Sequence, residues 1–206
     1  MGTTGTLRER HALRTRQAIV SAAVELFVER GFHETTVDDI AARADIAPRT
    51  FFRYFPTKEA VLFPDADAKS NWIMGALAAR PADEHPFASL LAVVGELADE
   101  VEAAGDEIDL RQRLAADCPG LRTYERTVLE TRVGDTVAAF VAGRLGVADD
   151  ADPRPRVWAG LAMSSFRVAL HLWLDSGRTG RLRAAVDAAL GAAAEAVAVA
   201  GHLPSP

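Results

Sequence analysis

Cysteine is almost absent from this chain, which has one, Cys118, among 206 residues. A single thiol excludes an internal disulfide framework and a multi-thiolate metal site, and it fits a reducing cytoplasm. No apolar signal core follows the N-terminus. The most alanine-rich stretch, residues 184–200, carries two acids, which argues against a membrane span. We therefore expect a cytoplasmic protein that does not enter a membrane.

The motifs of common enzyme classes are missing as well. The sequence contains no Gly-x-Ser-x-Gly, no phosphate-binding loop, no Gly-x-Gly-x-x-Gly and no His-Glu-x-x-His zinc motif. Its five histidines are scattered, and none has a histidine or cysteine partner at metal-ligand spacing. We expect a protein that is not an enzyme and has no cofactor and no metal. Strand and hairpin signals are also lacking, so the sequence predicts an all-α fold.

Positive charge is scarce overall but gathers at the N-terminus. The net charge is −6, yet residues 1–62 hold nine Lys and Arg against eight Asp and Glu. Within the first sixteen residues, four arginines accompany one acid, Glu9. These arginines are Arg8, Arg10, Arg14 and Arg16. A locally basic end on an acidic protein permits contact with DNA at one face only.

The N-terminal sequence predicts a long helix and two short ones. An apolar stripe at helical spacing predicts a first helix over residues 8–30, which Gly31 ends. Thr36 as a cap, with an acid three residues later, predicts a short second helix. Residues 45–47 form the turn, and Pro48 is a favourable first residue for a third helix that ends near Phe55.

Amphipathic segments continue to the C-terminus. Thr57 is expected to cap a fourth helix that passes Pro64, with a kink or break near Phe63 because proline removes a backbone bond. Proline, glycine and acidic loops separate the later helices. These are expected at 66–79, 87–104, 107–117, 120–146, 155–176 and 180–201. We therefore predict an N-terminal helix-turn-helix unit in residues 1–62 and a helical effector-binding and dimerisation bundle in residues 63–206.

The predicted third helix has two unlike faces. Phe51 and Phe55 lie one turn apart and should face the apolar sides of the first two helices. The opposite face presents Arg49, Thr50 and Arg53, with Phe52 and Tyr54 on its flanks. Arginine can bond guanine bidentately in the major groove, so we expect this helix to read bases. Thr36 and Lys58, at helix N-termini, are expected to hold phosphates.

Two arginines on a helix are by themselves more often a solvated surface, but the longer pattern over residues 14–62 resembles the TetR family of repressors. The pattern reads Ala22-Ala23-x-x-Leu26-Phe27, Gly31-Phe32-x-x-Thr35-Thr36-Val37-x-x-Ile40-Ala41 and Ala44-Asp45-Ile46-Ala47-x-x-Thr50-Phe51-Phe52-x-Tyr54-Phe55-x-x-Lys58-Glu59. The family usually has glycine, serine and tyrosine where Asp45, Ala47 and Phe52 stand. These departures remove a side-chain cap and a hydroxyl and add a negative charge, so we expect weaker anchoring to phosphates.

The resemblance implies a homodimer that binds a palindromic double-stranded DNA operator and is released by a small apolar or amphipathic effector. The last two helices look like the family's dimer-forming pair, with interface candidates Trp173, Ala185, Ala188, Ala189 and Ala192. The effector candidates are the large apolar side chains, although each of them taken by itself is more often plain core. They are Trp72, Phe87, Leu91, Tyr124, Phe140, Trp158, Met163 and Phe166. The sequence of residues 49–55 is similar to a subgroup that includes mycofactocin-system regulators, which respond to acyl-CoA.

Two other classes of protein remain open on the sequence. One is an enzyme without a recognisable motif, and the other is a helical scaffolding dimer that does not bind DNA. A gel-shift assay against the upstream region of its own gene separates both from a repressor.

Overall fold

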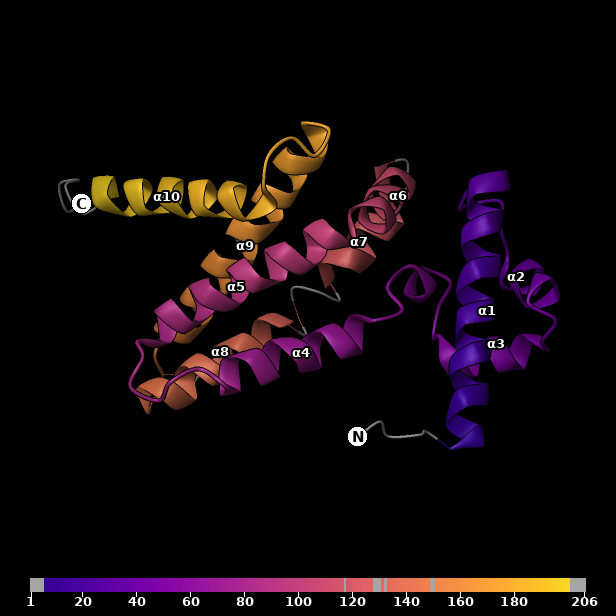
Figure 1. Ribbon diagram of the computed structural model, residues 1–206, viewed down its shortest axis with the longest axis horizontal. Helices are drawn as coiled ribbons and strands as arrows, with labels where there is room; N and C mark the ends of the chain where they lie inside the picture. The colour runs from indigo at the N-terminus through magenta and orange to yellow at the C-terminus, as the bar shows by residue number, and fades with distance from the viewer. Residues whose placement is uncertain (1–5, 117, 128–130, 132, 149–150, 201–206) are drawn as a thin grey trace. The chain divides into compact units, whose positions relative to one another are not determined.

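The computed structural model describes residues 6–116, 118–127, 131, 133–148 and 151–200. Regular structure in these residues is helical throughout, as the sequence predicts (Figure 1). The elements are α1 (Leu7–Arg30), α2 (Val37–Arg43), α3 (Pro48–Tyr54), the 3₁₀ helix η1 (Glu59–Leu62), α4 (Ala66–Ala78), α5 (Pro86–Ala103), α6 (Gly105–Ala116), α7 (Pro119–Thr127), α8 (Gly134–Leu145), α9 (Arg154–Asp175) and α10 (Leu182–Ala200).

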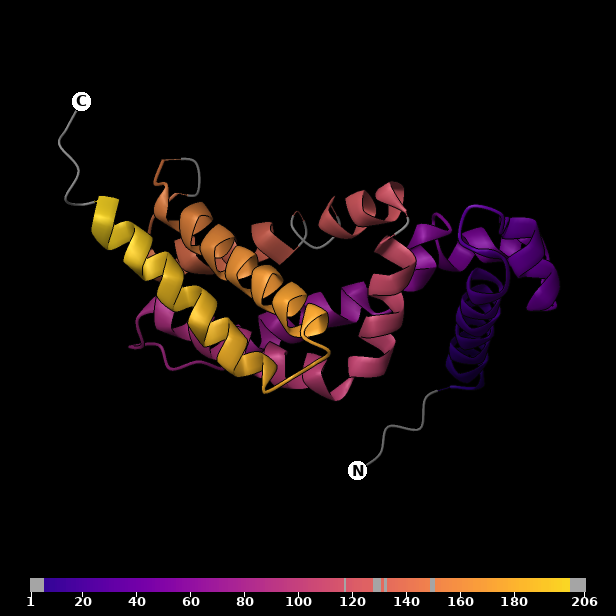
Figure 2. The same ribbon diagram turned by 90° about the horizontal axis from the view of Figure 1, so that it is seen from above.

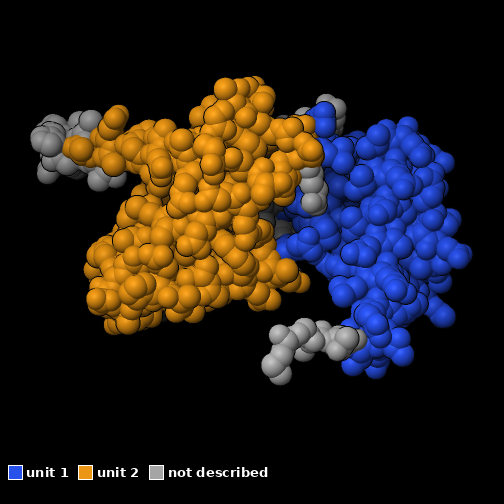
Figure 3. Space-filling view, in the orientation of Figure 1, with its two compact units in different colours: residues 1–66, 110–125 blue, residues 67–109, 126–206 orange. Residues whose placement is uncertain are grey.

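The chain divides into two compact units (Figure 3). Unit 1 comprises residues 1–66 and 110–125, and unit 2 comprises residues 67–109 and 126–206. This division differs from two consecutive domains with a boundary after residue 62, because a later segment joins the N-terminal unit. The cause is burial: Cys118 and Leu121 are 2% and 0% exposed within the apolar core of unit 1.

Unit 1 begins with a capped α1. The Thr6 hydroxyl accepts a hydrogen bond from the Glu9 amide at 3.3 Å, and the Glu9 carboxylate accepts one from the Thr6 amide at 2.7 Å. The helix ends at Gly31, whose φ of 87° suits glycine. The predicted apolar stripe of α1 is buried, and it meets Ile40 of α2 and Phe51 of α3 in one core.

The fourth predicted helix forms only in part. Thr57 caps a short 3₁₀ turn, since its hydroxyl accepts a hydrogen bond from the Ala60 amide at 3.4 Å. Phe63 then leaves the helical region with φ −124° and ψ 54°, which confirms the predicted break. The predicted continuation of one helix past Pro64 is wrong, because α4 begins anew at Ala66.

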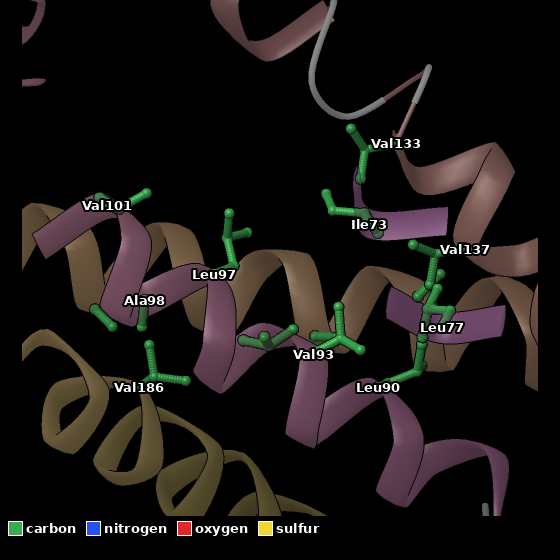
Figure 4. Close-up of a cluster of buried hydrophobic side chains, with 14 of the residues drawn as sticks. Ile73, Leu77, Leu90, Val93, Leu97, Ala98, Val101, Val133, Val137 and Val186 are labelled. Carbon is green, nitrogen blue, oxygen red and sulfur yellow. The ribbon is translucent and has the colours of Figure 1, made fainter. Parts of the chain in front are cut away.

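Unit 2 is a bundle of helices around a second core (Figure 4), in which α9 and α10 pack along each other (Figure 2). The single helix predicted over 120–146 is wrong, because this stretch contains α7 and α8. Leu121 of α7 packs in unit 1, whereas Val137 and Val141 of α8 pack in unit 2. The apolar residues of this stretch therefore pack in two different cores. Helical periodicity alone does not separate the two sets, so it predicts one continuous apolar stripe.

Helix α9 is one described helix that is long and apolar enough to cross a membrane, judged by length and composition alone. Core helices of globular bundles pass the same test. One face of α9 is buried in unit 2 through Ala162, Ala169 and Trp173. A neighbouring face, roughly 100° around the helix, exposes Val157, Val168 and Leu172, at 59%, 48% and 61%. Val168 and Leu172 lie one turn apart, and exposed apolar side chains aligned along one helix face are typical of a surface that another molecule covers.

Candidate nucleic-acid interface

The α2–α3 pair begins with a closed capping box. The Thr36 hydroxyl accepts a hydrogen bond from the Asp39 amide at 3.1 Å, and both the amide and the hydroxyl of Thr36 donate to the Asp39 carboxylate. These bonds, together with the charge of Arg30, lower the pKa of Asp39. Both donors of Thr36 are thus engaged within the protein. The structure gives this residue a capping role and leaves it no donor for the phosphate that the sequence assigns to it.

The turn between the two helices depends on an unusual backbone at Asp45. Its φ is 52°, in the left-handed region that glycine adopts readily and that aspartate tolerates better than most residues. The Ile46 amide then donates to the Ala41 carbonyl at 3.0 Å, which closes the turn. Pro48 starts α3 as predicted, and Ala47 makes no side-chain cap bond. This geometry explains why glycine suits position 45.

Helix α3 divides into the two predicted faces. Phe51 and Phe55 are buried, at 0% and 2% exposure. On the other face Arg49, Phe52 and Arg53 are exposed, and Thr50 and Tyr54 are half-buried on its flanks. The Arg53 guanidinium lies over the Tyr54 ring at 5.1 Å and donates to its hydroxyl at 3.4 Å. The buried side of α3 is fixed in the core, and its other side therefore exposes two arginines and the ring of Phe52.

Lys58 has a different environment from the one predicted. Its ammonium donates to the Phe32 carbonyl at 2.7 Å and to the Thr35 carbonyl at 3.0 Å, and it lies over the Phe32 ring at 4.3 Å. Two of its three N–H donors therefore hold the loop between α1 and α2. Only the third donor remains for a phosphate.

Arg16 is a positioning residue that the sequence argument missed. Its guanidinium lies over the Phe55 ring at 4.7 Å and donates to the Pro64 carbonyl. It thereby joins α1 to the end of α3 and to the break before α4. The sequence showed Arg16 only as one of four N-terminal cations, because its acceptor at Pro64 lies 48 residues further along the chain.

Unit 2 contains a small apolar cavity with room for about a water molecule. Its lining is Ile73, Leu77, Leu90, Val93, Val94, Leu97, Val133, Val137, Ala162 and Met163, most of which are drawn in Figure 4. Of the eight predicted effector residues, only Met163 lines it. The sequence argument favoured large aromatic side chains, whereas aliphatic residues of α4, α5 and α8 enclose this space.

The other predicted effector residues pack around this core or elsewhere. Five lie partly buried against the core of unit 2, and Leu91 is half-buried on α5. The five are Trp72, Phe87, Phe140, Trp158 and Phe166. Among these, Phe87 and Trp158 have ring centroids 5.6 Å apart. Tyr124 does not join them, because it belongs to unit 1, where its ring lies 5.8 Å from that of Phe63.

Polar groups near the start of α5 are already paired. The Glu84 carboxylate accepts hydrogen bonds from the Arg80 guanidinium at 2.5 Å and from the buried Ser89 hydroxyl at 2.7 Å. These bonds lower the pKa of Glu84 to about 2, with the Arg80 bond as the main cause. The cavity itself is lined by apolar side chains, so it offers recognition by shape and hydrophobicity.

The predicted dimer residues separate into buried and exposed groups. Trp173 is 4% exposed, and its indole N–H donates to the Gly180 carbonyl at 3.1 Å, so the structure places it inside unit 2. Ala185 and Ala189 are half-buried against the same core. Ala188 and Ala192 are exposed on α10.

The fold and the exposed face of α3 define a helix-turn-helix DNA-binding protein. Residues 19–63 match the family model for bacterial regulatory proteins of the tetR family, and residues 84–198 match the model of the MftR C-terminal domain. The chain belongs to the TetR family of transcriptional regulators.

Individual relatives agree with this assignment. The HTH-type transcriptional regulator TcmR of Streptomyces glaucescens is 35% identical over 173 residues, which cover 81% of this chain and 76% of the relative. The putative mycofactocin biosynthesis regulator MftR of Mycobacterium tuberculosis is 32% identical over 159 residues, which cover 74% and 78%. The solved structure of FadR from Thermus thermophilus, a TetR family repressor in complex with lauroyl-CoA, has a TM-score of 0.59 at 24% identity and covers 93% of this chain and 96% of that one. This last likeness concerns the fold.

Proposed function

We propose that this protein is a dimeric repressor that binds a palindromic operator and is released by an apolar or amphipathic effector. The observation that carries the proposal is the exposed face of α3, where Arg49 and Arg53 stand on a buried Phe51–Phe55 base. A helix held rigidly on one side can present its other side to the major groove with little further loss of conformational entropy. The regulator acts in the cytoplasm and catalyses no reaction.

The apolar stripe of α9 supports the dimer. One short α3 covers only a few base pairs, so two copies related by two-fold symmetry are needed for a useful site. Val157, Val168 and Leu172 lie on one side of α9 and are about half or more exposed, which is costly without a partner. Ala188 and Ala192 of α10 allow close approach of helices. The proposed interface therefore consists of these five residues and omits Trp173.

The apolar cavity supports an effector with an aliphatic chain. The residues that α4, α5 and α8 contribute to its lining are aliphatic, and several of them are labelled in Figure 4. The FadR structure that shares this fold contains lauroyl-CoA, so we propose an acyl-CoA ester as the effector. The cavity has room for about one water molecule, so an acyl chain must bind to a conformation in which these helices stand further apart. Such a ligand releases DNA only if that conformation matches the operator less well.

The break at Pro64 is a place where such motion could be absorbed. Pro64 stands between η1 and α4, and its carbonyl accepts a hydrogen bond from Arg16. If the chain bends at Pro64, the hydrogen bond from Arg16 keeps the N-terminal side of the bend fixed to unit 1.

The experiment uses full-length protein and a duplex selected from a random library by repeated binding. Lauroyl-CoA, free laurate and free coenzyme A are then titrated into the complex while anisotropy reports DNA release. We expect a palindromic consensus and release by lauroyl-CoA. Failure to select any duplex would overturn the repressor. Selection without release by lauroyl-CoA would overturn the effector class alone.

Asp45 offers a further test of the turn and of its charge. Asp45→Gly is expected to stabilise unit 1 by about 0.5–1 kcal/mol, because glycine adopts the φ of 52° without a side-chain clash. Asp45→Asn removes the charge but keeps a residue of similar left-handed tolerance. Both variants should therefore bind DNA roughly two- to fivefold more tightly at low salt, and only the glycine variant should melt higher. Equal melting temperatures would contradict the strain at this position.

A further inference from the structure

The first three turns of α1 stand clear of the core. Every residue from Leu7 to Ala18 is exposed or half-buried, and the first buried residue of the helix is Ile19. Leu7 and Leu13 are 79% and 59% exposed. Of its side chains, Arg16 contacts the Phe55 ring and the Pro64 carbonyl. A helix of about twelve residues without a buried side chain is marginal in water, so this segment depends on its cap, on this anchor and on whatever partner covers it. We call residues 7–18 the α1 arm.

Three cations of the arm have no partner among the described residues. Across the part of the chain that the structure describes, no hydrogen bond or ion pair involves the side chains of Arg8, Arg10 and Arg14. The single acid of the arm, Glu9, is used by the capping box.

Two other arginines of unit 1 are paired with acidic residues instead. Arg43 contacts Glu25 at 3.1 Å and Glu29 at 3.0 Å, and its hydrogen bond to Glu29 lowers the pKa of that carboxyl. Arg30 lies 3.8 Å from Asp39. Acidic residues are thus placed against the arginines of α2 and the end of α1, while the arm stays positive.

The arm extends from the C-terminal end of α3. Arg16 lies against Phe55, the residue that follows the last residue of α3, Tyr54. Helical rise places Arg8 roughly 12 Å further along α1 than Arg16. Figure 1 shows α1 continuing beyond α3 toward the N-terminus. A distance of this order is comparable to the width of a DNA groove, so the arm can reach the backbone next to the site that α3 reads.

We propose that the α1 arm is a second DNA contact, in which Arg8, Arg10 and Arg14 bind phosphates flanking each half-site. This inference rests on the proposed DNA binding by α3. Arginine–phosphate contacts carry no base information, so the arm adds affinity and salt dependence but no specificity. Exposed arginines that lack acidic partners are the chemistry that a phosphate backbone complements.

The test is the triple variant Arg8→Gln, Arg10→Gln and Arg14→Gln in the full-length protein. Glutamine keeps helix propensity and much of the side-chain length and removes three charges. Affinity for the selected duplex and for a scrambled duplex of equal length is measured between about 50 and 200 mM salt. The slope of log K against log salt should become shallower by about 0.9 for each phosphate that the arm no longer binds. Affinity for both duplexes should fall by the same factor, so the specificity ratio should stay unchanged.

The matched control removes three exposed arginines from unit 2 with the same change in net charge. It carries Arg154→Gln, Arg178→Gln and Arg181→Gln, whose side chains are 50%, 38% and 67% exposed. The slope of this control should equal that of the wild type. An unchanged slope in the arm variant, or an equal change in the control, would refute phosphate binding by the α1 arm. Either result would leave the proposed function of α3 intact. Wild-type protein that binds neither duplex overturns the proposed function and the arm together.

Discussion

Replacement of both Arg49 and Arg53 by alanine is expected to abolish sequence-specific DNA binding without unfolding the protein. Both side chains are exposed, and the core side of α3 is formed by Phe51 and Phe55. A bidentate arginine–guanine pair is worth about 1–3 kcal/mol, so two arginines in two half-sites contribute at least about 4 kcal/mol. This corresponds to a fall of about a thousandfold in affinity, measured by anisotropy on the selected duplex.

The lysine variant separates base reading from charge. Arg53→Lys keeps the positive charge but cannot form the planar bidentate pair, so it should lose specificity at one base position and keep its affinity for scrambled DNA. Circular dichroism and melting temperature should match the wild type in every variant. Operator binding that survives the double alanine substitution would show that α3 is not the reading helix.

Replacement of Leu172 by aspartate is expected to convert the dimer to a monomer. Leu172 is 61% exposed in the chain by itself and lies on the apolar stripe with Val168. In a two-fold interface the substitution buries two like charges near each other, which opposes association strongly. Loss of the second subunit removes the avidity of two linked half-sites, so operator affinity should fall roughly a hundredfold or more.

The matched control is Val28→Asp, which introduces the same charge at a 63% exposed valine on α1 in unit 1. Sedimentation should give a dimer for the wild type and for this control, and a monomer for Leu172→Asp. A dimer that survives the Leu172 substitution would place the interface elsewhere. A wild-type monomer at micromolar concentration would refute the proposed interface altogether.

The helix-turn-helix could be predicted because its signals are local. A capping box at Thr36, proline at the start of α3 and phenylalanines one turn apart act within a few residues, and each holds in the structure. Burial of Phe51 and Phe55 then determines that Arg49 and Arg53 point outward. The resemblance to the TetR family rests on this same stretch and is confirmed by the family models and by the relatives.

The effector region was harder to predict, because a helix such as α9 carries apolar residues on more than one side, with Ala169 buried and Val168 exposed. Trp173 has the size of an interface residue but is buried in unit 2, and Tyr124 packs in unit 1. The cavity is lined by valines and leucines that no motif distinguishes from ordinary core. Which apolar residues enclose a space depends on how helices pack, and a sequence does not state that packing.

The all-α class, the two faces of α3 and the break at Phe63 follow from the amino-acid sequence, since each depends on the backbone chemistry and periodicity of neighbouring residues. Only the folded chain shows that residues 110–125 complete the core of unit 1 and that Lys58 holds the carbonyls of Phe32 and Thr35. The same holds for the α1 arm, in which Arg8, Arg10 and Arg14 have no partner among the described residues while Arg43 is neutralised. The physical reason is range: caps and turns act over a few residues, whereas burial and ion pairing join residues that are distant in the chain.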